Sequence, residues 1–200
     1  MLNQDGMAGA TDVLSPLARN ILKINADNAY QKLVVADGDG NPDAKAIMEG
    51  LAPSQLLSAP VGRPENAAAM MAGLWLWHDW LDESHVISQA LGSATGSFWH
   101  AIMHRREGDF SNSKYWYART AGHPIYTALA AHALTVINPL PADKQLLRVV
   151  REGWDADAFV DLVERVSGRD GEPRLRTVQA LQQMEWRLLF EHCAREAGGR

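Results

Sequence analysis

The sequence has little of three features that would point to particular classes of protein. Its 200 residues contain one cysteine, Cys193, which excludes an internal disulfide and leaves no Cys-x-x-Cys pair for a zinc knuckle. Residues 1–20 have neither the basic start nor the continuous apolar run of a signal peptide. The longest apolar-rich stretch, 67–81, contains His78 and Asp79 and is too short to cross a bilayer. These absences predict a soluble, cytoplasmic protein with no membrane partner.

Positive charge is also scarce. The chain has 19 Lys and Arg residues against 24 Asp and Glu residues, and its formal net charge is −5. A general nucleic-acid binder presents a basic face, so we expect no nucleic-acid partner. One window, 97–123, is locally basic. It holds Arg105, Arg106, Lys114 and Arg119 against Glu107 and Asp109. A basic patch within an acidic chain suits a small-molecule ligand that is anionic or polar.

Strand signals are few, whereas helix signals are many. The only β-branched run of note is 33–35, while prolines, serines and glycines repeatedly stand where helices begin or end. The pattern predicts an all-α, single-domain helical bundle with short connecting loops. We expect residues 1–63 to form an N-terminal helical region and connector, residues 64–200 to form the helical core, and the two together to make one domain.

The expected helix boundaries follow these punctuating residues. Pro64 and Gly92 predict one long helix from Glu65 to Leu91. The next helix begins at Thr95 or Ser97 and is ended by Gly108, and another begins at Ser111 or Asn112 and stops before Gly122. Further helices are expected after Pro124, Pro141, Asp155 and Pro173.

The stretch 37–43 has the start of a calcium-binding pattern, with oxygen-bearing side chains at residues 37, 39, 41 and 43. The pattern then fails. Its sixth position is Pro42 instead of glycine, and its twelfth is Met48 instead of glutamate. We therefore predict a solvated turn.

A polar stripe is expected on the long helix. At 100° per residue, His78, Asp82 and His85 fall beside the apolar arc, so they should be partly buried. Asp82 lies one turn from both histidines and would orient an imidazole and raise its pKa. A satisfied polar network in the core would give the same pattern.

The following helix carries a second polar face that contains His100, His104 and Glu107. Histidines four residues apart can chelate one metal ion, and Glu107 would complete a two-histidine, one-carboxylate set suited to zinc or ferrous iron. This is not the zincin motif, because Ala101 follows His100. Whether a divalent ion is bound stays open. The candidate catalytic residues are His78, Asp82, His85, His100, His104 and Glu107, and the candidate metal ligands are His100, His104 and Glu107.

Cationic and aromatic residues supply a candidate substrate-binding wall. Arg105 and Arg106 diverge around their helix, so one should serve a structural ion pair while the other offers a planar fork to an anion. On the last helix, Glu185 lies on an apolar face and requires a cation such as Arg105, Arg106 or Arg119. The candidate substrate-binding residues are Arg105, Arg106, Lys114, Trp99, Trp116 and Tyr117.

Three segments together resemble the signature of an uncharacterised bacterial protein family. They are AGLWLWHDWLDESHVISQ, GSFWHAIMHRREGDFSNSKYWYART and HPIY. The resemblance covers roughly residues 72–126 and, more loosely, LQQMEWRLLFEHC near the end. It implies no reaction, cofactor or partner.

Three functions fit these residues. The first is an enzyme that acts on a small anionic or polar substrate, either with a metal that activates water or with a histidine base oriented by Asp82. The others are a non-catalytic small-ligand-binding protein and a structural or interaction protein whose polar cluster is a buried network. Chemistry is narrowly favoured because such a cluster is costly to bury and is concentrated in one third of the chain. The enzyme hypothesis predicts that the histidine face around His100 meets the stripe around His85 across a shared pocket.

Overall fold

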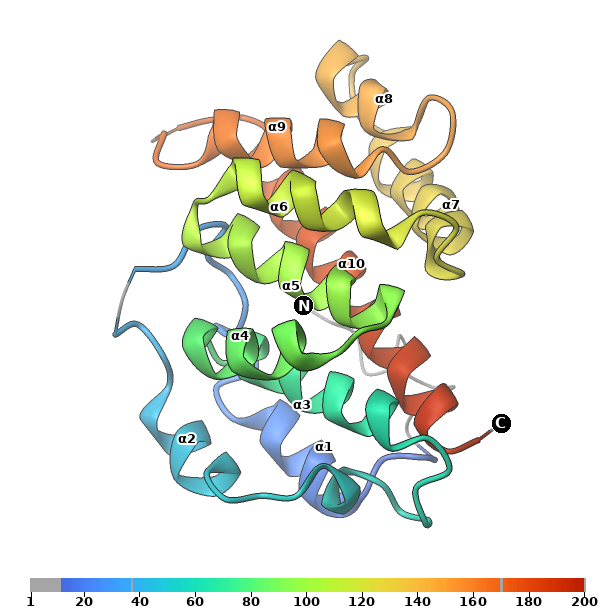
Figure 1. The fold of residues 1–200 in the computed structure, drawn as a ribbon. Helices are drawn as coiled ribbons and strands as arrows, with labels where there is room; N and C mark the ends of the chain where they lie inside the picture. Colours follow the sequence, from blue (N-terminus) through green and yellow to red (C-terminus); the bar gives the residue numbers. More distant parts are fainter. Residues whose placement is uncertain (1–11, 37, 170, 200) are drawn as a thin grey trace.

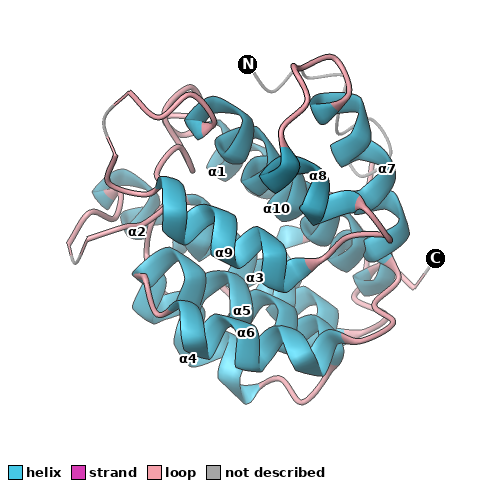
Figure 2. Cartoon of the chain, turned by 90° about the horizontal axis from the view of Figure 1, so that it is seen from above, coloured by secondary structure: helices cyan, strands magenta, loops and turns pink. Residues whose placement is uncertain are grey.

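The computed structural model describes residues 12–36, 38–169 and 171–199 and confirms an all-α bundle (Figure 1). In chain order the α-helices are α1 (Pro16–Lys23), α2 (Pro42–Met48), α3 (Pro64–Trp77), α4 (Leu81–Ala90), α5 (Ala94–Glu107), α6 (Phe110–Tyr117), α7 (Ile125–Ile137), α8 (Lys144–Val150), α9 (Ala156–Val166) and α10 (Leu175–Ala197). Two short 3-10 helices, η2 (Pro53–Leu56) and η3 (Ala118–Thr120), complete the set. The described residues form no strand (Figure 2).

The helices stack in successive layers. α1 and α2 lie at one end of the molecule, and from there α3 and α4 are followed by α5, then α6, then α9 (Figure 1). The longest helix, α10, packs against both α3 and α7. No helix in the described part of the chain combines the length and the apolar character needed to cross a membrane.

Local side-chain chemistry fixes most helix ends. Gly108 ends α5 in the left-handed conformation with φ of 90°, as predicted. The caps at the starts of α5 and α6 lie slightly earlier than expected, because the Ser93 hydroxyl accepts the Gly96 N–H and the Asp109 carboxylate accepts the Asn112 N–H.

The stretch 37–43 is a turn that leads into a helix. The Asn41 side chain accepts the backbone N–H groups of residues 43 and 44 and so caps α2. Exposed Asp39 accepts the Ala36 N–H (3.2 Å) and pairs with Lys32 (2.6 Å). Asp37 lies outside the described residues. These side chains are engaged in capping and in a surface ion pair, in agreement with a solvated turn.

The single helix expected from Glu65 to Leu91 is wrong. The chain instead forms α3 and α4, with a break at 78–80 where Asp79 adopts φ of 64°. The break is held by hydrogen bonds that join residues 76–80 to other parts of the chain. Arg106 donates to the Leu76 carbonyl (2.6 Å) and to the Asp79 carboxylate (2.7 Å), and the Trp80 indole donates to the Asn41 carbonyl (2.9 Å). Tertiary partners therefore override the helical pattern of the sequence.

Tight packing in the core depends on one small residue. The indole of Trp186 donates to the Gly73 carbonyl (2.8 Å), so α10 lies close against α3. A Cβ added at Gly73 would lie 2.8 Å from the Trp99 ring and 3.3 Å from the Phe190 ring. Both rings are fully buried, so neither has room to move away.

We therefore expect Gly73→Ala to destabilise the protein. Overpacking costs about 1–3 kcal/mol, which outweighs the gain of about 1 kcal/mol in helix propensity. Urea denaturation measures the difference. Gly92→Ala is the matched control because a Cβ there meets nothing within 4 Å. Equal stabilities for the two variants would contradict this account of the α3–α10 contact.

Candidate metal site

Three histidines meet between α4 and α5. His85 comes from α4, and His100 and His104 lie one turn apart on α5. One ring nitrogen from each lies within 4.8 Å of the other two. The ring centroids of His85 are 4.7 Å from His100 and 5.4 Å from His104. We call these three residues the histidine cluster.

His100 is the most unusual member of the cluster. Its side chain is 2% exposed, and neither ring nitrogen forms a hydrogen bond with any described residue. Burial, together with the charges of His104 and His85, lowers its pKa to about 4. The ring is therefore neutral at pH 7 and keeps a lone pair. A buried polar atom without a partner costs about 1–3 kcal/mol, which is the cost that a bound ligand would remove.

Two neighbours hold the rings in place. The Trp116 ring stacks on His100 with centroids 4.0 Å apart and an interplanar angle of 20°. His104 Nδ1 lies 2.5 Å from Glu107 Oε1, so the carboxylate accepts that proton and leaves the lone pair on Nε2. The Asn112 side-chain amide donates to this Nε2 (3.0 Å), so a metal ion at Nε2 would replace that hydrogen bond. Glu107 thus orients His104 in the way that outer carboxylates orient metal-binding histidines.

The structure therefore replaces one member of the metal-ligand set expected from the sequence, with His85 in the place of Glu107. His100 and His104 lie together as expected, and the third residue beside both of them is His85. Glu107 belongs to a second group of close ligand atoms, with His104 and Asp109, on the more exposed side of α5. The sequence predicted that His85 faces these histidines as part of a polar stripe that also contains His78 and Asp82.

That stripe does not exist, because the chain breaks after α3. His78 ends α3, is 2% exposed, and donates its Nε2 proton to the Ile21 carbonyl of α1 (3.0 Å). Asp82 is exposed in the first turn of α4. The prediction that Asp82 joins two histidines on one face is wrong, and His78 forms a contact between α1 and α3 instead.

Arg105 lies in a fully buried network. It donates to Glu185 (2.5 Å) and to the Tyr117 hydroxyl (2.6 Å), and that hydroxyl donates to the other Glu185 oxygen (2.8 Å). Both ion-pair partners are 0% exposed. The structure confirms that Glu185 takes a cation, and it leaves neither Arg105 nor Tyr117 free to grip a substrate at the histidine cluster.

Arg106 is equally enclosed. Its guanidinium lies 4.1 Å from the centre of the Tyr30 ring and donates to the Lys32 carbonyl, in addition to its contacts at the α3–α4 break. The expectation that one of the two arginines offers a fork to an anion is therefore wrong. Both guanidinium groups are occupied by partners within the chain.

The other candidate substrate-binding residues do not line one common site. Trp99 is fully buried and donates to the Cys193 sulfur (3.4 Å), which makes it a core residue. Lys114 pairs with Asp161 of α9. Trp116 alone contacts the histidine cluster.

A second histidine pair was not identified from the sequence. His123 and His192 have ring centroids 4.9 Å apart and line a cavity of about 340 Å³. His123 donates from Nε2 to the Thr95 hydroxyl (3.1 Å), since its Nδ1 accepts the Ile125 N–H. Burial and the neighbouring His192 lower the pKa of His123 to about 4. The two residues lie far apart in the sequence, so no spacing indicated the pair.

These histidines predict a pH dependence of stability. His100 and His123 have a pKa of about 4 in the fold and an ordinary value of 6.5. Between those values the unfolded chain binds protons that the fold does not, so the free energy of unfolding falls as pH falls from 6.5 towards 4. Each group contributes at most about 1.4 kcal/mol per pH unit. Urea denaturation between pH 7 and pH 5 should show this slope, and His100→Gln should reduce it. An unchanged slope in the variant would contradict the assignment.

Comparison with known proteins finds no matching family model, no matching curated protein and no matching solved structure. The resemblance to a bacterial family stays a prediction, and the functional argument rests on the geometry of the site.

Proposed function

We propose that the protein is a metal-dependent enzyme in which His85, His100 and His104 hold a divalent ion. The ion would activate water or polarise a small polar or anionic substrate. The observation that carries the proposal is the state of His100, a neutral imidazole that is 2% exposed, has no hydrogen bond to any described residue, and lies beside two further histidines. A metal ion is the partner that all three rings can share.

The donor set fits catalytic chemistry better than a closed structural site. Structural zinc sites use four protein ligands, whereas catalytic sites use three and keep one position open for water or substrate. Three histidine ligands would leave the full charge on the ion, and in such sites that charge lowers the pKa of bound water to about 7 and attracts an anion. Half-buried His85 and Asn112 and exposed Glu107 mark the side from which solvent reaches the cluster.

The first test is metal binding by the protein purified without a histidine tag. We expect about one equivalent of bound metal, or uptake of one equivalent of zinc, iron, nickel or manganese during calorimetric titration. A free ligand at about 100 times its Kd stabilises the fold by roughly 2.7 kcal/mol, so the thermal midpoint should rise clearly. Absence of bound metal, combined with no thermal shift for any of the four ions, would refute the proposal.

Glu107→Gln tests the orienting carboxylate. The amide accepts the His104 proton less strongly, so we expect metal affinity to fall about 10–100-fold. The fold should survive because the Glu107 side chain is 39% exposed. Glu164→Gln, an exposed position on α9, is the control and should leave affinity unchanged. Equal affinities in the two variants would show that Glu107 does not orient a metal ligand.

A further inference from the structure

Three of the four lysines and arginines in the basic window 97–123 form ion pairs with acidic residues. They are Arg105, Arg106 and Lys114, and their acids are Glu185, Asp79 and Asp161. The fourth cation, Arg119 of η3, is exposed and forms no ion pair with any described residue. Its charge is therefore available to a ligand.

Two aromatic neighbours hold the Arg119 side chain in place. The guanidinium carbon lies 3.7 Å from the centre of the Tyr115 ring and 5.2 Å from the centre of the Trp116 ring. The guanidinium donates to the Tyr115 carbonyl (3.0 Å) and to the Tyr115 hydroxyl. A guanidinium has five N–H groups, so most of its donors remain available. Arg119 therefore presents a preorganised fork of the kind that binds a carboxylate or a phosphate.

Trp116 connects this arginine with the histidine cluster. Its ring lies beside the Arg119 guanidinium and also stacks on His100, with centroids 4.0 Å apart. One indole ring therefore separates the guanidinium from the most buried member of the cluster. A molecule that reaches from the cluster to Arg119 must span the width of that ring.

The two ends of the histidine cluster differ in charge. α6 runs antiparallel to α5, so the start of α6 lies beside His104 and its end lies beside His100. The carboxylates of Glu107 and Asp109 lie close to His104, whereas Arg119 follows the end of α6. Coulomb repulsion at the first end and attraction at the second would direct an anion towards Arg119.

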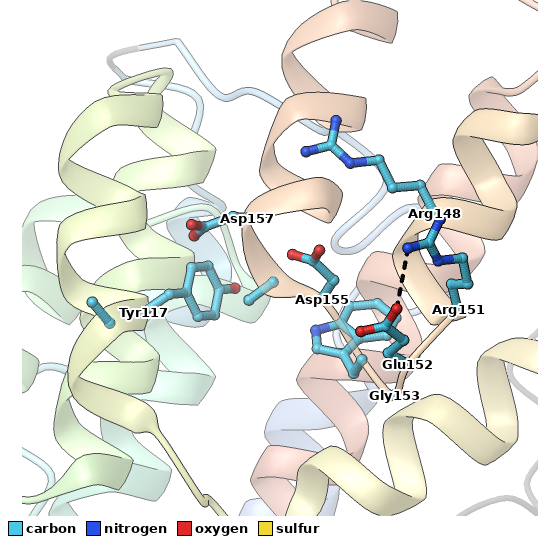
Figure 3. Close-up of a pocket in the computed structure, with 10 residues that line it drawn as sticks. Tyr117, Arg148, Arg151, Glu152, Gly153, Asp155 and Asp157 are labelled. Carbon is cyan, nitrogen blue, oxygen red and sulfur yellow. Dashed lines mark hydrogen bonds and ion pairs between the residues drawn. The ribbon is translucent and has the colours of Figure 1, made fainter.

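A separate cavity between the end of α6, the end of α8 and the start of α9 offers no comparable cation (Figure 3). Its volume is about 540 Å³, and none of its lining residues belongs to the histidine cluster. Both of its arginines already have an acidic neighbour. Arg151 pairs with Glu152 (3.1 Å), which is the dashed contact in Figure 3, and Arg148 lies 3.6 Å from Asp161.

We propose that the substrate of the metal site is an organic oxyanion, a carboxylate or a phosphate ester, whose charged group is bound by Arg119. The assignment rests on the proposed function, because it takes the histidine cluster to hold the metal ion. The reacting group of the substrate meets the ion, and the oxyanion pairs with Arg119 on the far side of Trp116. Arg119 is thus a substrate-binding residue that selects molecules with an anionic group set apart from the reacting group.

Metal-binding probes with and without a charged end test the proposal. Each probe is a hydroxamate, which binds zinc, joined by a chain of graded length to a carboxylate, a phosphonate or a methyl group. In calorimetric titration of the zinc-loaded protein, we expect at least one charged probe to bind at least about tenfold more tightly than its methyl-ended twin. The tighter of the carboxylate and phosphonate series identifies the class of oxyanion. Equal affinities of charged and methyl-ended probes at every chain length would overturn the proposal.

Variants of Arg119 then locate the bound charge. Arg119→Gln should remove the preference for a charged end, while zinc and the methyl-ended probe should bind as they do to the wild-type protein. Arg119→Lys keeps the charge without the planar fork, so it should retain only part of the preference. Arg165→Gln makes the same charge change at an exposed position of α9 and should retain all of it. An undiminished preference in Arg119→Gln would overturn the proposal.

Zinc binding separates a failure of this assignment from a failure of the proposed function. If the wild-type protein binds no zinc, both are wrong. If it binds zinc at the histidine cluster and the probes show no preference for a charged end, the metal site stands and the role of Arg119 is wrong.

Discussion

Replacing Arg105 by methionine should lower the free energy of unfolding by about 3–5 kcal/mol, because it leaves a buried carboxylate without its cation. Glu185 is 0% exposed and would retain only the hydrogen bond from Tyr117. Water cannot replace the lost guanidinium at the interface of α5, α6 and α10. This loss is a large fraction of the stability of an ordinary domain.

Urea denaturation measures the effect, and two further variants isolate its cause. Arg165→Met removes an exposed arginine of α9 and should change stability by less than about 0.5 kcal/mol. The double variant Arg105→Met, Glu185→Leu removes both buried charges, so it should recover much of the stability lost in the single variant. A single variant as stable as the control would contradict the assignment of Arg105 to the core.

Replacing His100 by alanine should reduce metal affinity by about 100-fold or more, since one of three ligands is lost. Zinc should then no longer raise the thermal midpoint. His85→Ala removes a half-buried ligand from α4 with less disturbance of the core, so it tests the same claim if His100→Ala folds poorly. His132→Ala changes an exposed histidine of α7 and serves as the control.

The double variant His100→Ala, His104→Ala separates a binding site from a structural network. A metal site predicts that the metal-free variant keeps its fold and no longer responds to zinc. If the variant unfolds and the wild-type protein shows no response to metal, the cluster is structural. Full zinc affinity in His85→Ala would contradict the three-histidine site.

The helices of the second half of the chain were predictable because their ends are local. Pro124, Asp155 and Gly108 act within one turn of their own positions, through a fixed φ, a capping carboxylate and a left-handed residue. The break between α3 and α4 could not be predicted in the same way. It depends on Arg106 and on the Asn41 carbonyl, which lie in other elements.

In the candidate site too, the contacts within one helix were predictable and the contacts between distant elements were not. The spacing of His100 and His104 places them on one face of α5, and local geometry also brings Glu107 to His104. The roles of the arginines depend on distant partners. Arg105 meets Glu185, 80 residues away, so an arginine of the locally basic stretch that suggested an anion site forms a buried ion pair instead.

Anomalous diffraction from zinc-soaked crystals tests the central claim most directly. The account predicts one strong peak at the zinc edge, between α4 and α5, about 2.0–2.1 Å from a ring nitrogen of each of His85, His100 and His104. A zinc ion bound elsewhere, for example at His123 and His192, with no peak at the histidine cluster would contradict it.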